Sequence, residues 1–242
     1  MQSQPQEVNS LTRNERHKMT EAKKRSSISM LKSKSPVVEQ YRTIRTNLQF
    51  SAVEKDIRSM IFTSANPGEG KSTTSINVAA VFAQQGKRIL IIDADLRKPS
   101  VHTNFNMENF LGLTNIITKQ NQLQEAIQSS IYPNLDVLTS GPIPPNPSEL
   151  LGSNGMENLL EEAKMNYDLV ILDTPPVNAV TDAQILANMT DGVVLVVSSG
   201  STEIQQAKKA KELLQKADAK LLGAILNKKK QKYSDEYYYY GK

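Results

Sequence analysis

Six short apolar segments recur along the middle of the chain, and polar or helix-forming sequence separates them. The segments are residues 60–63, 88–93, 134–139, 168–173, 192–197 and 221–227. Their apolar character is nearly continuous, which is typical of strands covered on both faces. The intervening sequence predicts helices over residues 72–85, 156–166, 181–189 and 203–218. Strands that alternate with helices predict the α/β class, a doubly wound and mostly parallel sheet with helices on both faces.

The pattern changes at both ends and divides the chain into three parts. Residues 1–34 are polar and charged with almost no periodic apolar positions, so we expect a mobile tail there. Residues 35–227 form the folded domain, which begins with a helix over about 37–50. Residues 228–242 are basic and then tyrosine-rich, which predicts a second mobile tail.

The helix expected over 37–50 presents two different faces. Its apolar stripe consists of Val37, Tyr41, Ile44 and Leu48. The charged residues Glu39, Arg42 and Arg45 recur every three positions and therefore share another face. Taken from the residues alone, this second face is a salt-bridged surface exposed to solvent.

Composition narrows the classes of function. The 242 residues suffice for one sizeable α/β domain with tails, and the absence of cysteine excludes disulfides, zinc–thiolate sites and thiol chemistry. A net charge of +4 is mild, and without a focused basic patch we expect no nucleic-acid partner. No apolar run approaches the roughly 20 residues of a membrane helix, so we expect a cytosolic protein.

One loop between a predicted strand and a predicted helix carries a phosphate-binding motif. It reads SANPGEGKS from Ser64 to Ser72, with Ala65 where the usual motif has its first glycine. Such glycines let backbone N–H groups turn inward around phosphates, and the helix N-terminus adds positive potential. We interpret Lys71 as the side chain that reaches the outer phosphates and Ser72 as a ligand of Mg²⁺. The candidate nucleotide-binding residues of this P-loop are Pro67, Gly68, Glu69, Gly70, Lys71, Ser72 and Thr73.

Three aspartates at the ends of predicted strands are candidate metal and catalytic residues. Asp173 ends the strand at 168–173, on the edge of the sheet where such folds bind ligands. Asp93 and Asp95 follow the strand at 88–93, and side-chain alternation places both on one side if the strand continues that far. One carboxylate could help to hold hydrated Mg²⁺ and the other could accept a proton from an attacking hydroxyl. The residues alone leave open which of Asp93 and Asp95 accepts it.

Three further polar residues have two interpretations each. Arg97 and Lys98 follow the aspartate pair, where they could neutralise phosphate charge or lie solvated at the surface. Asn227 follows the last predicted strand, where its amide could bind the edge of a nucleotide base or form a turn.

The C-terminus concentrates tyrosine. Five of the eight tyrosines lie in the last ten residues, namely Tyr233, Tyr237, Tyr238, Tyr239 and Tyr240. Four consecutive tyrosines suit neither an amphipathic helix nor a half-buried strand. A stacking surface for nucleic acid is an alternative, but such surfaces are normally mounted on a folded element. Ten extended residues reach about 33 Å at most, so the cluster could enter the site of a neighbouring copy more freely than its own.

From about residue 37 onward, the chain resembles the bacterial tyrosine kinases of capsule and exopolysaccharide synthesis. Within that family it is most similar to the separate-chain cytosolic kinases of Gram-positive bacteria. The resemblance rests on PGEGKS at 67–72, IDADLRKP at 92–99, SGPIPPNPSEL at 140–150, LDTPP at 172–176 and the terminal tyrosines.

The resemblance implies a P-loop nucleoside-triphosphatase fold that transfers the γ-phosphoryl group of ATP to tyrosine with the help of Mg²⁺. By the family's motifs, the catalytic residues are Lys71, Asp93 and Asp95, and the metal ligands are Ser72, Asp93, Asp95 and Asp173. Asn227 would join the P-loop in binding the nucleotide. The phosphoacceptors would be Tyr233, Tyr237, Tyr238, Tyr239 and Tyr240.

The resemblance also implies partners. Glu39, Arg42 and Arg45 match an E-x-x-R-x-x-R helix that lies between the subunits of a homo-oligomeric ring, in which the tails are phosphorylated in trans. A membrane adaptor would activate the kinase through its cytoplasmic tail and recruit it to the inner face of the cell membrane. A cognate tyrosine phosphatase would reverse the modification.

Two other functions compete with the kinase. A nucleotide-switched positioning ATPase of the same superfamily would normally carry an extra lysine early in the P-loop, where this chain has Asn66. An ATP-gated scaffold without kinase activity would not require all three aspartates.

Overall fold

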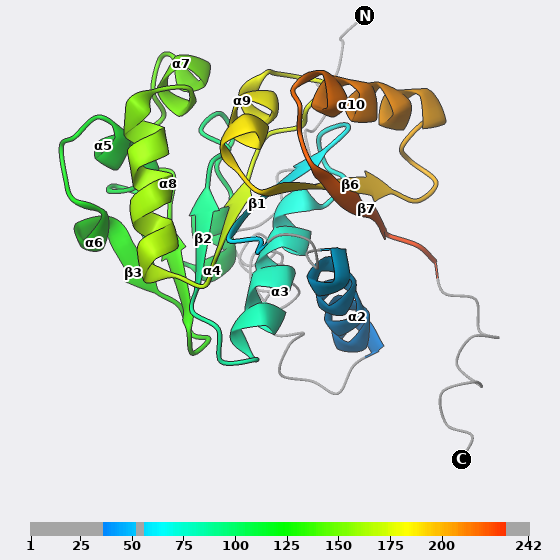
Figure 1. The fold of residues 1–242 in the computed structure, drawn as a ribbon, viewed down its shortest axis with the longest axis horizontal. Helices are drawn as coiled ribbons and strands as arrows, with labels where there is room; N and C mark the ends of the chain where they lie inside the picture. Colours follow the sequence, from blue (N-terminus) through cyan, green and yellow to red (C-terminus); the bar gives the residue numbers. More distant parts are fainter. Residues whose placement is uncertain (1–35, 52–55, 231–242) are drawn as a thin grey trace, which may run out of the picture.

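The computed structural model describes residues 36–51 and 56–230, and these form a layered α/β structure around a seven-stranded sheet (Figure 1). The predicted tail at 1–34, most of the tail at 228–242 and the five C-terminal tyrosines lie outside the described residues. The strand order is β3-β4-β2-β5-β1-β6-β7. The strands are β1 (Ser59–Ser64), β2 (Ile89–Asp93), β3 (Ile127–Ser129), β4 (Leu135–Leu138), β5 (Leu169–Asp173), β6 (Gly192–Ser198) and β7 (Leu221–Asn227).

The pairing of the strands confirms the predicted, mostly parallel sheet. All adjacent pairs are parallel except β3 and β4, which are antiparallel at one edge. The six predicted strands are all present, and their ends differ from the prediction by at most one residue. The seventh strand, β3, was not predicted, because its three residues are too short to show a strand pattern. Six strands run the same way, so their carboxyl ends lie along one side of the sheet, here called the carboxyl edge, and their amino ends lie along the opposite side, the amino edge.

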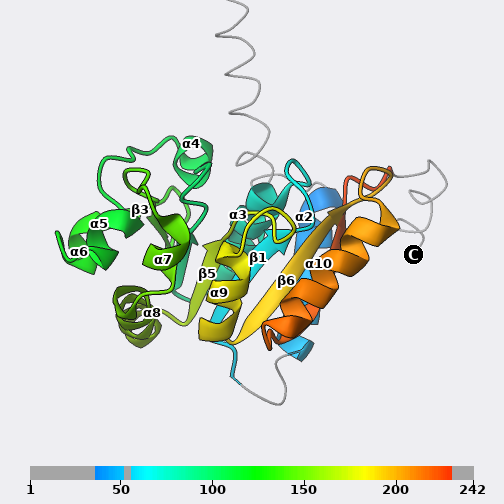
Figure 2. The same cartoon turned by 90° about the horizontal axis from the view of Figure 1, so that it is seen from above.

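Helices cover both faces of the sheet, as predicted (Figure 2). They are α2 (Pro36–Ser51), α3 (Lys71–Ala83), α4 (Val101–Phe105), α5 (Leu113–Ile117), α6 (Leu123–Ala126), α7 (Pro147–Leu151), α8 (Asn154–Asn166), α9 (Asp182–Met189) and α10 (Ile204–Lys216). The short helices α4, α5 and α6 were not predicted, because four or five residues hold little more than one helical turn.

Two apolar clusters separated by the sheet form the core. Side chains from α2, α3 and α4 pack on one face with Phe62 and Ile91, whereas α8, α9 and α10 pack on the other face with Ile61 and Leu90. Neighbouring residues of a strand thus point to opposite clusters, which explains why the sequence shows continuous apolar runs.

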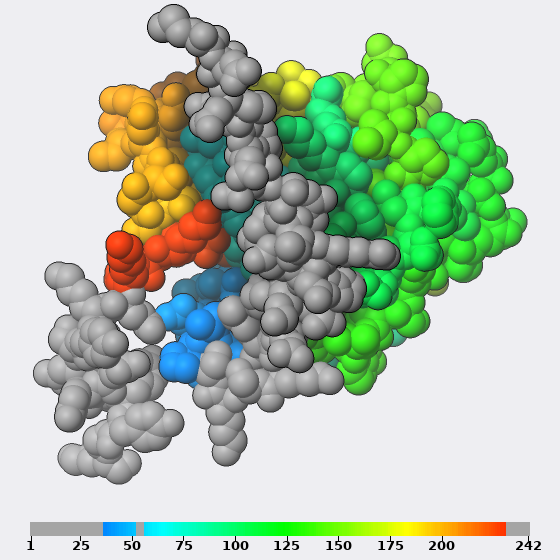
Figure 3. All heavy atoms as spheres, turned by 180° about the vertical axis from the view of Figure 1, so that it is seen from behind, coloured from blue at the N-terminus to red at the C-terminus, as the bar shows by residue number. Residues whose placement is uncertain are grey.

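Helix α2 packs against α3 and also contacts β7. In the space-filling view, α2 (blue) lies below the red end of the described chain (Figure 3). Its buried stripe differs by one position from the prediction, because Val38 is buried at 1% exposure and Val37 is only half-buried. Tyr41, Ile44 and Leu48 complete the stripe as expected. Among residues 36–51 and 56–230, no helix combines the length and the apolarity that a membrane span requires.

Candidate active site

The P-loop joins the carboxyl end of β1 to the start of α3. Gly68 and Gly70 have φ angles of 79° and 91°, a left-handed conformation that favours glycine and turns the backbone inward. A Cβ atom on Gly70 would lie 2.1 Å from Asn227 Nδ2, so this position also lacks room for a side chain. The first helical residue is Lys71, which places the amide groups of the loop at a helix N-terminus suited to binding phosphate.

A buried carboxylate braces this loop from inside. Glu69 is only 4% exposed, and its Oε2 accepts a hydrogen bond from the backbone N–H of Ala65 (2.9 Å). Its Oε1 accepts another from Thr202 Oγ1 (2.6 Å), on the loop after β6. The Glu69 side chain therefore supports the loop from inside. Thr202 was missed by the sequence analysis, since nothing in the local sequence marks it as a partner of the P-loop.

Lys71 lies between two buried carboxylates. Its Nζ is 3.0 Å from Asp95 Oδ2, 3.4 Å from Asp173 Oδ2 and 3.3 Å from Ser72 Oγ. Burial by itself would lower the pKa of Lys71, but the charges of Asp173 and Asp95 outweigh it and raise the pKa above its ordinary value. Three of the residues expected at the site, from three different segments, are thus in direct contact.

Asp173 offers an oxygen that no group in the described part of the chain satisfies. The residue is fully buried and its Oδ1 has no hydrogen-bond partner among the described residues. Burial raises the pKa of Asp173 while the nearby Lys71 lowers it, and the net direction is upward. A buried, unpaired carboxylate oxygen beside a serine hydroxyl suits a hard cation such as Mg²⁺.

The protein supplies only some of the ligands that Mg²⁺ needs, and the phosphates of a bound nucleotide and water would supply the rest. Within the described ranges, no three His, Cys, Asp or Glu side chains converge closely enough to hold a metal on their own. Mg²⁺ in nucleotide sites is typically held by one or two carboxylates, water and phosphate oxygens, so the oxygens of Ser72 and Asp173 are sufficient protein donors.

The two aspartates after β2 have different positions. The strand ends at Asp93, so Asp95 lies outside it and side-chain alternation along the strand does not place the two carboxylates on one side. Asp93 Oδ2 accepts hydrogen bonds from the backbone N–H groups of Ser100 and Val101, both at 2.9 Å. Burial and the neighbouring Asp173 raise the pKa of Asp93 to about 7. Asp93 thus anchors the loop, and the turn that follows brings Asp95 to Lys71.

The other polar candidates make contacts within the protein. Asn227 Nδ2 donates to the carbonyl of Glu69 (2.9 Å), and Lys228 Nζ donates to the carbonyl of Gly68 (2.7 Å). The end of β7 therefore braces the tip of the P-loop. Arg97 pairs with Asp182, and Lys98 is exposed.

The charged face of α2 is partly used within the chain. Arg42 and Glu39 are exposed and form an ion pair, as expected of a salt-bridged face. Arg45 instead donates from Nη1 to the carbonyl of Val81 in α3 (2.9 Å). Among the described residues, Glu39 and Arg42 are therefore the exposed part of this charged face.

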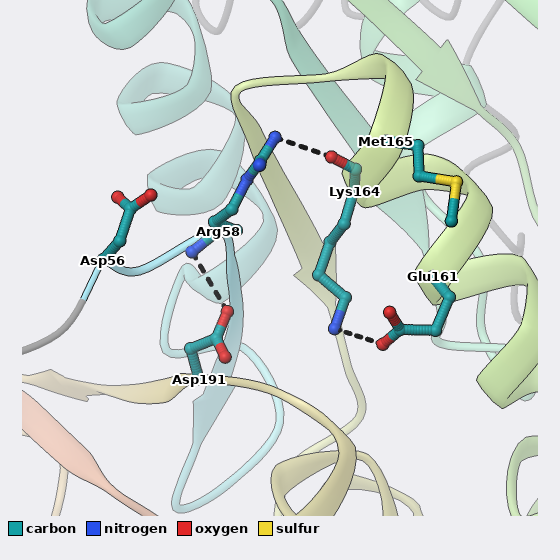
Figure 4. Close-up of a pocket in the computed structure, with 6 residues that line it drawn as sticks. All are labelled: Asp56, Arg58, Glu161, Lys164, Met165 and Asp191. Atoms are coloured by element: carbon teal, nitrogen blue, oxygen red, sulfur yellow. Dashed lines mark hydrogen bonds and ion pairs between the residues drawn. The ribbon is translucent and has the colours of Figure 1, made fainter.

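A second group of charged residues lies at the opposite edge of the sheet (Figure 4). Its members are Asp56, Arg58, Glu161, Lys164 and Asp191, and together with Met165 they line a cavity of about 330 Å³ next to the starts of β1 and β6. Arg58 donates to Asp191 through its backbone and to the Lys164 carbonyl through its guanidinium, and Lys164 pairs with Glu161. Lys164 and Glu161 satisfy each other, whereas the Arg58 guanidinium and the Asp191 carboxylate are satisfied by backbone groups and the Ser59 hydroxyl. None of the residues that line this cavity has a buried side-chain atom without a partner, in contrast to Asp173.

Comparison with known proteins decides between the functions that this geometry allows. The AAA domain family model matches residues 57–226. Tyrosine-protein kinase YwqD of Bacillus subtilis (strain 168) is 58% identical over 217 residues, which cover 90% of this chain and 92% of YwqD. The chain belongs to the bacterial tyrosine-protein kinases. The putative tyrosine-protein kinase CapB of Staphylococcus aureus is 45% identical over 225 residues, covering 91% of this chain and 99% of CapB.

Solved structures agree with this family. The chimerical protein CapA2B2 matches with a TM-score of 0.79 and 47% identity, over 82% of this chain and 87% of that chain. The septum site-determining protein MinD of Pyrococcus horikoshii OT3, complexed with Mg-ADP, matches with a TM-score of 0.60 but only 20% identity, over 70% and 69% of the two chains. MinD therefore shares the fold alone, and the positioning-ATPase alternative is not favoured over the kinase.

Proposed function

We propose that this kinase binds ATP with Mg²⁺ at the P-loop and transfers the γ-phosphoryl group to C-terminal tyrosines of another copy. The acceptors would be Tyr233, Tyr237, Tyr238, Tyr239 and Tyr240. The observation that supports the proposal is the position of Lys71, which lies between Asp95 and Asp173 at the N-terminus of α3. Phosphoryl transfer needs this combination, because its transition state is stabilised mainly by positioned charge.

Each residue of the site has a proposed task. The P-loop amides hold the phosphates, and Lys71 neutralises charge on the transferred group. Ser72 Oγ and Asp173 Oδ1 would hold Mg²⁺, which would offset the negative charge of the phosphates. Asp95 would accept the proton of the tyrosine hydroxyl, since it lies beside Lys71 and is 5% exposed. Asp93 is fully buried and bound to two backbone amides, so we assign it to holding the loop.

The regulatory setting is also proposed. Glu39 and Arg42 would contact a neighbouring subunit of a homo-oligomeric ring, and a membrane adaptor would activate the kinase at the inner face of the membrane. A cognate phosphatase would reset the tails, and the pathway would be capsule or exopolysaccharide synthesis. Five phosphotyrosines would add roughly −7 to −10 charges to a short tail, enough to favour separation of the subunits.

The test is to incubate the purified protein with Mg²⁺ and ATP and to map phosphotyrosine by mass spectrometry. Parallel samples contain the cytoplasmic tail of a candidate adaptor or the Lys71→Met variant. We expect phosphate on the terminal tyrosines and none in the variant. ATP hydrolysis without phosphotyrosine, even with the adaptor tail present, would refute the proposal and favour a switch ATPase.

A further inference from the structure

Arg97, Ser148 and Asp182 form a closed hydrogen-bond network beside the active site, here called the Arg97 clamp. Arg97 Nε donates to Asp182 Oδ2 (2.9 Å) and Nη2 donates to Asp182 Oδ1 (3.0 Å). Nη2 also donates to Ser148 Oγ (2.8 Å), and Ser148 Oγ donates to Asp182 Oδ1 (2.7 Å). Asp182 is fully buried while the Arg97 side chain is 37% exposed. The guanidinium therefore neutralises a buried carboxylate through two parallel hydrogen bonds, which fix the orientation of the Arg97 side chain.

The segment that carries Asp95 is held by one backbone hydrogen bond, from the N–H of Ala94 to the carbonyl of Asp173 (2.8 Å), and beyond it by side-chain contacts. Because β2 ends at Asp93, no strand pairing holds Asp95 in place. On one side, the carboxylate of Asp93 binds the backbone of the loop. On the other side, Leu96 is fully buried and Arg97 reaches Asp182. Asp95 lies between these fixed points, with its Oδ2 at 3.0 Å from Lys71 Nζ.

The clamp also joins the two loops whose carboxylates share Lys71. Asp182 is the first residue of α9, the helix that follows β5 and Asp173. Asp95 and Asp173 repel each other, and the charge of Asp95 is one of the causes that raise the pKa of Asp173. A tie between the loop after β2 and the start of α9 opposes that repulsion and keeps both carboxylates at the lysine. Ser148 lies in α7, which follows the proline-rich connection, and its hydrogen bonds to Arg97 and Asp182 join this helix to the same network.

We propose that Arg97, Asp182 and Ser148 are positioning residues that act through Asp95 on the binding of Mg²⁺-nucleotide and on phosphoryl transfer. The proposal rests on the proposed function of Lys71, Asp95 and Asp173. It assigns a task to Arg97 that differs from contact with phosphate, since the guanidinium already binds a carboxylate and a hydroxyl. A bidentate pair with a buried carboxylate cannot be replaced by a generic positive charge, because lysine lacks the planar fork.

The test uses Asp182→Asn, which keeps the size of the side chain and leaves the half-exposed Arg97 access to water. Its matched control is Tyr167→Phe, which removes the 2.9 Å hydrogen bond from Tyr167 Oη to Asp136 near the opposite edge of the sheet. For each variant we would measure unfolding temperature, binding of a fluorescent ADP analogue in EDTA, the Mg²⁺ concentration that gives half-maximal enhancement of that binding, and kcat and KM for ATP.

We expect Asp182→Asn to lower kcat by about 10- to 100-fold, since a displacement near 1 Å can have that effect. The Mg²⁺ midpoint should rise at least about threefold, while ADP binding in EDTA stays within about twofold. Tyr167→Phe should change neither. The proposal is overturned if Asp182→Asn leaves both the Mg²⁺ midpoint and kcat unchanged. It is also overturned if Tyr167→Phe lowers the unfolding temperature by the same amount and produces the same two changes, because general destabilisation would then explain them.

Two further variants keep the test decisive. If Asp182→Asn does not fold, Ser148→Ala removes one hydroxyl and should show the same pattern with a change of a few fold. Asp95→Asn combined with Asp182→Asn should be no worse than Asp95→Asn alone, because residues that act as a unit are not additive. Additive losses would mean that the clamp does not act through Asp95.

The Mg²⁺ titration does not require phosphotransfer. A wild type without kinase activity would therefore refute the proposed function, while the titration would still test the clamp.

Discussion

The two edges of the central sheet both collect charged residues, but they differ in how those charges are satisfied. At the amino edge, Asp191 Oδ2 accepts three hydrogen bonds, from the backbone N–H groups of Arg58 and Ser59 and from Ser59 Oγ. At the carboxyl edge, Asp95 and Asp173 share one buried lysine, and Asp173 Oδ1 has no partner among the described residues. The amino edge is built for stability, whereas the carboxyl edge keeps buried charge available for a ligand.

This difference shows that a ligand-binding site can be recognised by its unsatisfied buried charge even when no ligand is bound. Six buried side-chain atoms of the described residues lack a hydrogen-bond partner, and only Asp173 Oδ1 belongs to a carboxylate. Burying a charged group without a partner costs more than burying a neutral one, so this oxygen is the one that best marks a ligand site. Substitutions at the two edges should therefore separate activity from stability.

The largest effect is expected from Asp173→Asn at the carboxyl edge. We expect phosphotransfer to fall at least about 100-fold, since a neutral amide is a poor ligand for Mg²⁺ and leaves Lys71 with one carboxylate. The unfolding temperature should change by no more than a few degrees, because a partly unfavourable buried charge is removed. Phosphotyrosine assays and thermal unfolding measure both quantities. A stable variant with normal activity would show that Asp173 is not part of the catalytic machinery.

Asp191→Ala at the amino edge should have the opposite profile. It leaves the N–H groups of Arg58 and Ser59 and one hydroxyl without their acceptor, so the free energy of unfolding should fall by about 2–4 kcal/mol. Activity at a temperature well below the transition should stay within about twofold of wild type. Denaturant unfolding gives the first number and a kinase assay the second. Loss of activity in a folded protein would contradict the division between the edges.

Much of the fold was predictable from the sequence because apolar runs, P-loop glycines and strand-terminal aspartates are local signals. The six parallel strands, the helices on both faces and the residues around Lys71 follow from them. Strand β3 was missed because a three-residue antiparallel edge strand carries no pattern. The stripe of α2 was shifted by one residue because Val37 and Val38 are equally apolar, and only packing against α3 selects Val38.

The supporting contacts of the site were not predictable, because they join residues that are distant in the sequence. Thr202 reaches Glu69 and Asp182 reaches Arg97 only after the sheet has brought their loops together. Their own neighbours in the sequence give no sign of this. Asn227 shows the same limit, since it was expected to bind the nucleotide or form a turn, and its bond to the Glu69 carbonyl was not expected.

A smaller effect is expected from Thr202→Val, which keeps the shape and removes the hydroxyl that donates to Glu69. The P-loop should be less well ordered for phosphate binding, so the affinity for ADP should fall by about three- to tenfold, a loss of about 1 kcal/mol. Calorimetric titration measures the affinity. Thr181→Val, on the loop before α9, is a control of the same chemistry. An unchanged affinity for Thr202→Val would mean that Glu69 holds the loop without this contact.

The smallest effect is expected from Tyr41→Phe in α2. Burial raises the pKa of Tyr41, with hydrogen bonds to Thr74 and Asn77 acting in the opposite direction. An acid with a raised folded-state pKa retains its proton in the fold after the unfolded chain has lost it. Wild-type stability should therefore fall as the pH rises above about 10, the value for an unperturbed tyrosine.

The variant should be less stable by about 1 kcal/mol at pH 7, and the gap should narrow as the pH rises above about 10. Denaturant unfolding of both proteins between pH 7 and 11 isolates the contribution of this residue, since other tyrosines are common to both. A gap that is independent of pH would mean that the Tyr41 hydroxyl is not buried against α3.

The central claim is that the constellation of Lys71, Asp95 and Asp173 phosphorylates the tail of another copy, and a mixing experiment tests it most directly. One chain carries Lys71→Met with its tail intact, and the other is active but has phenylalanine in place of all five terminal tyrosines. Mixed with Mg²⁺, ATP and, where it is needed, the adaptor tail, they should yield phosphotyrosine on the Lys71→Met chain, at a rate that rises with the concentration of the active chain. No phosphotyrosine in the mixture, under conditions in which the wild type labels itself, would contradict the account.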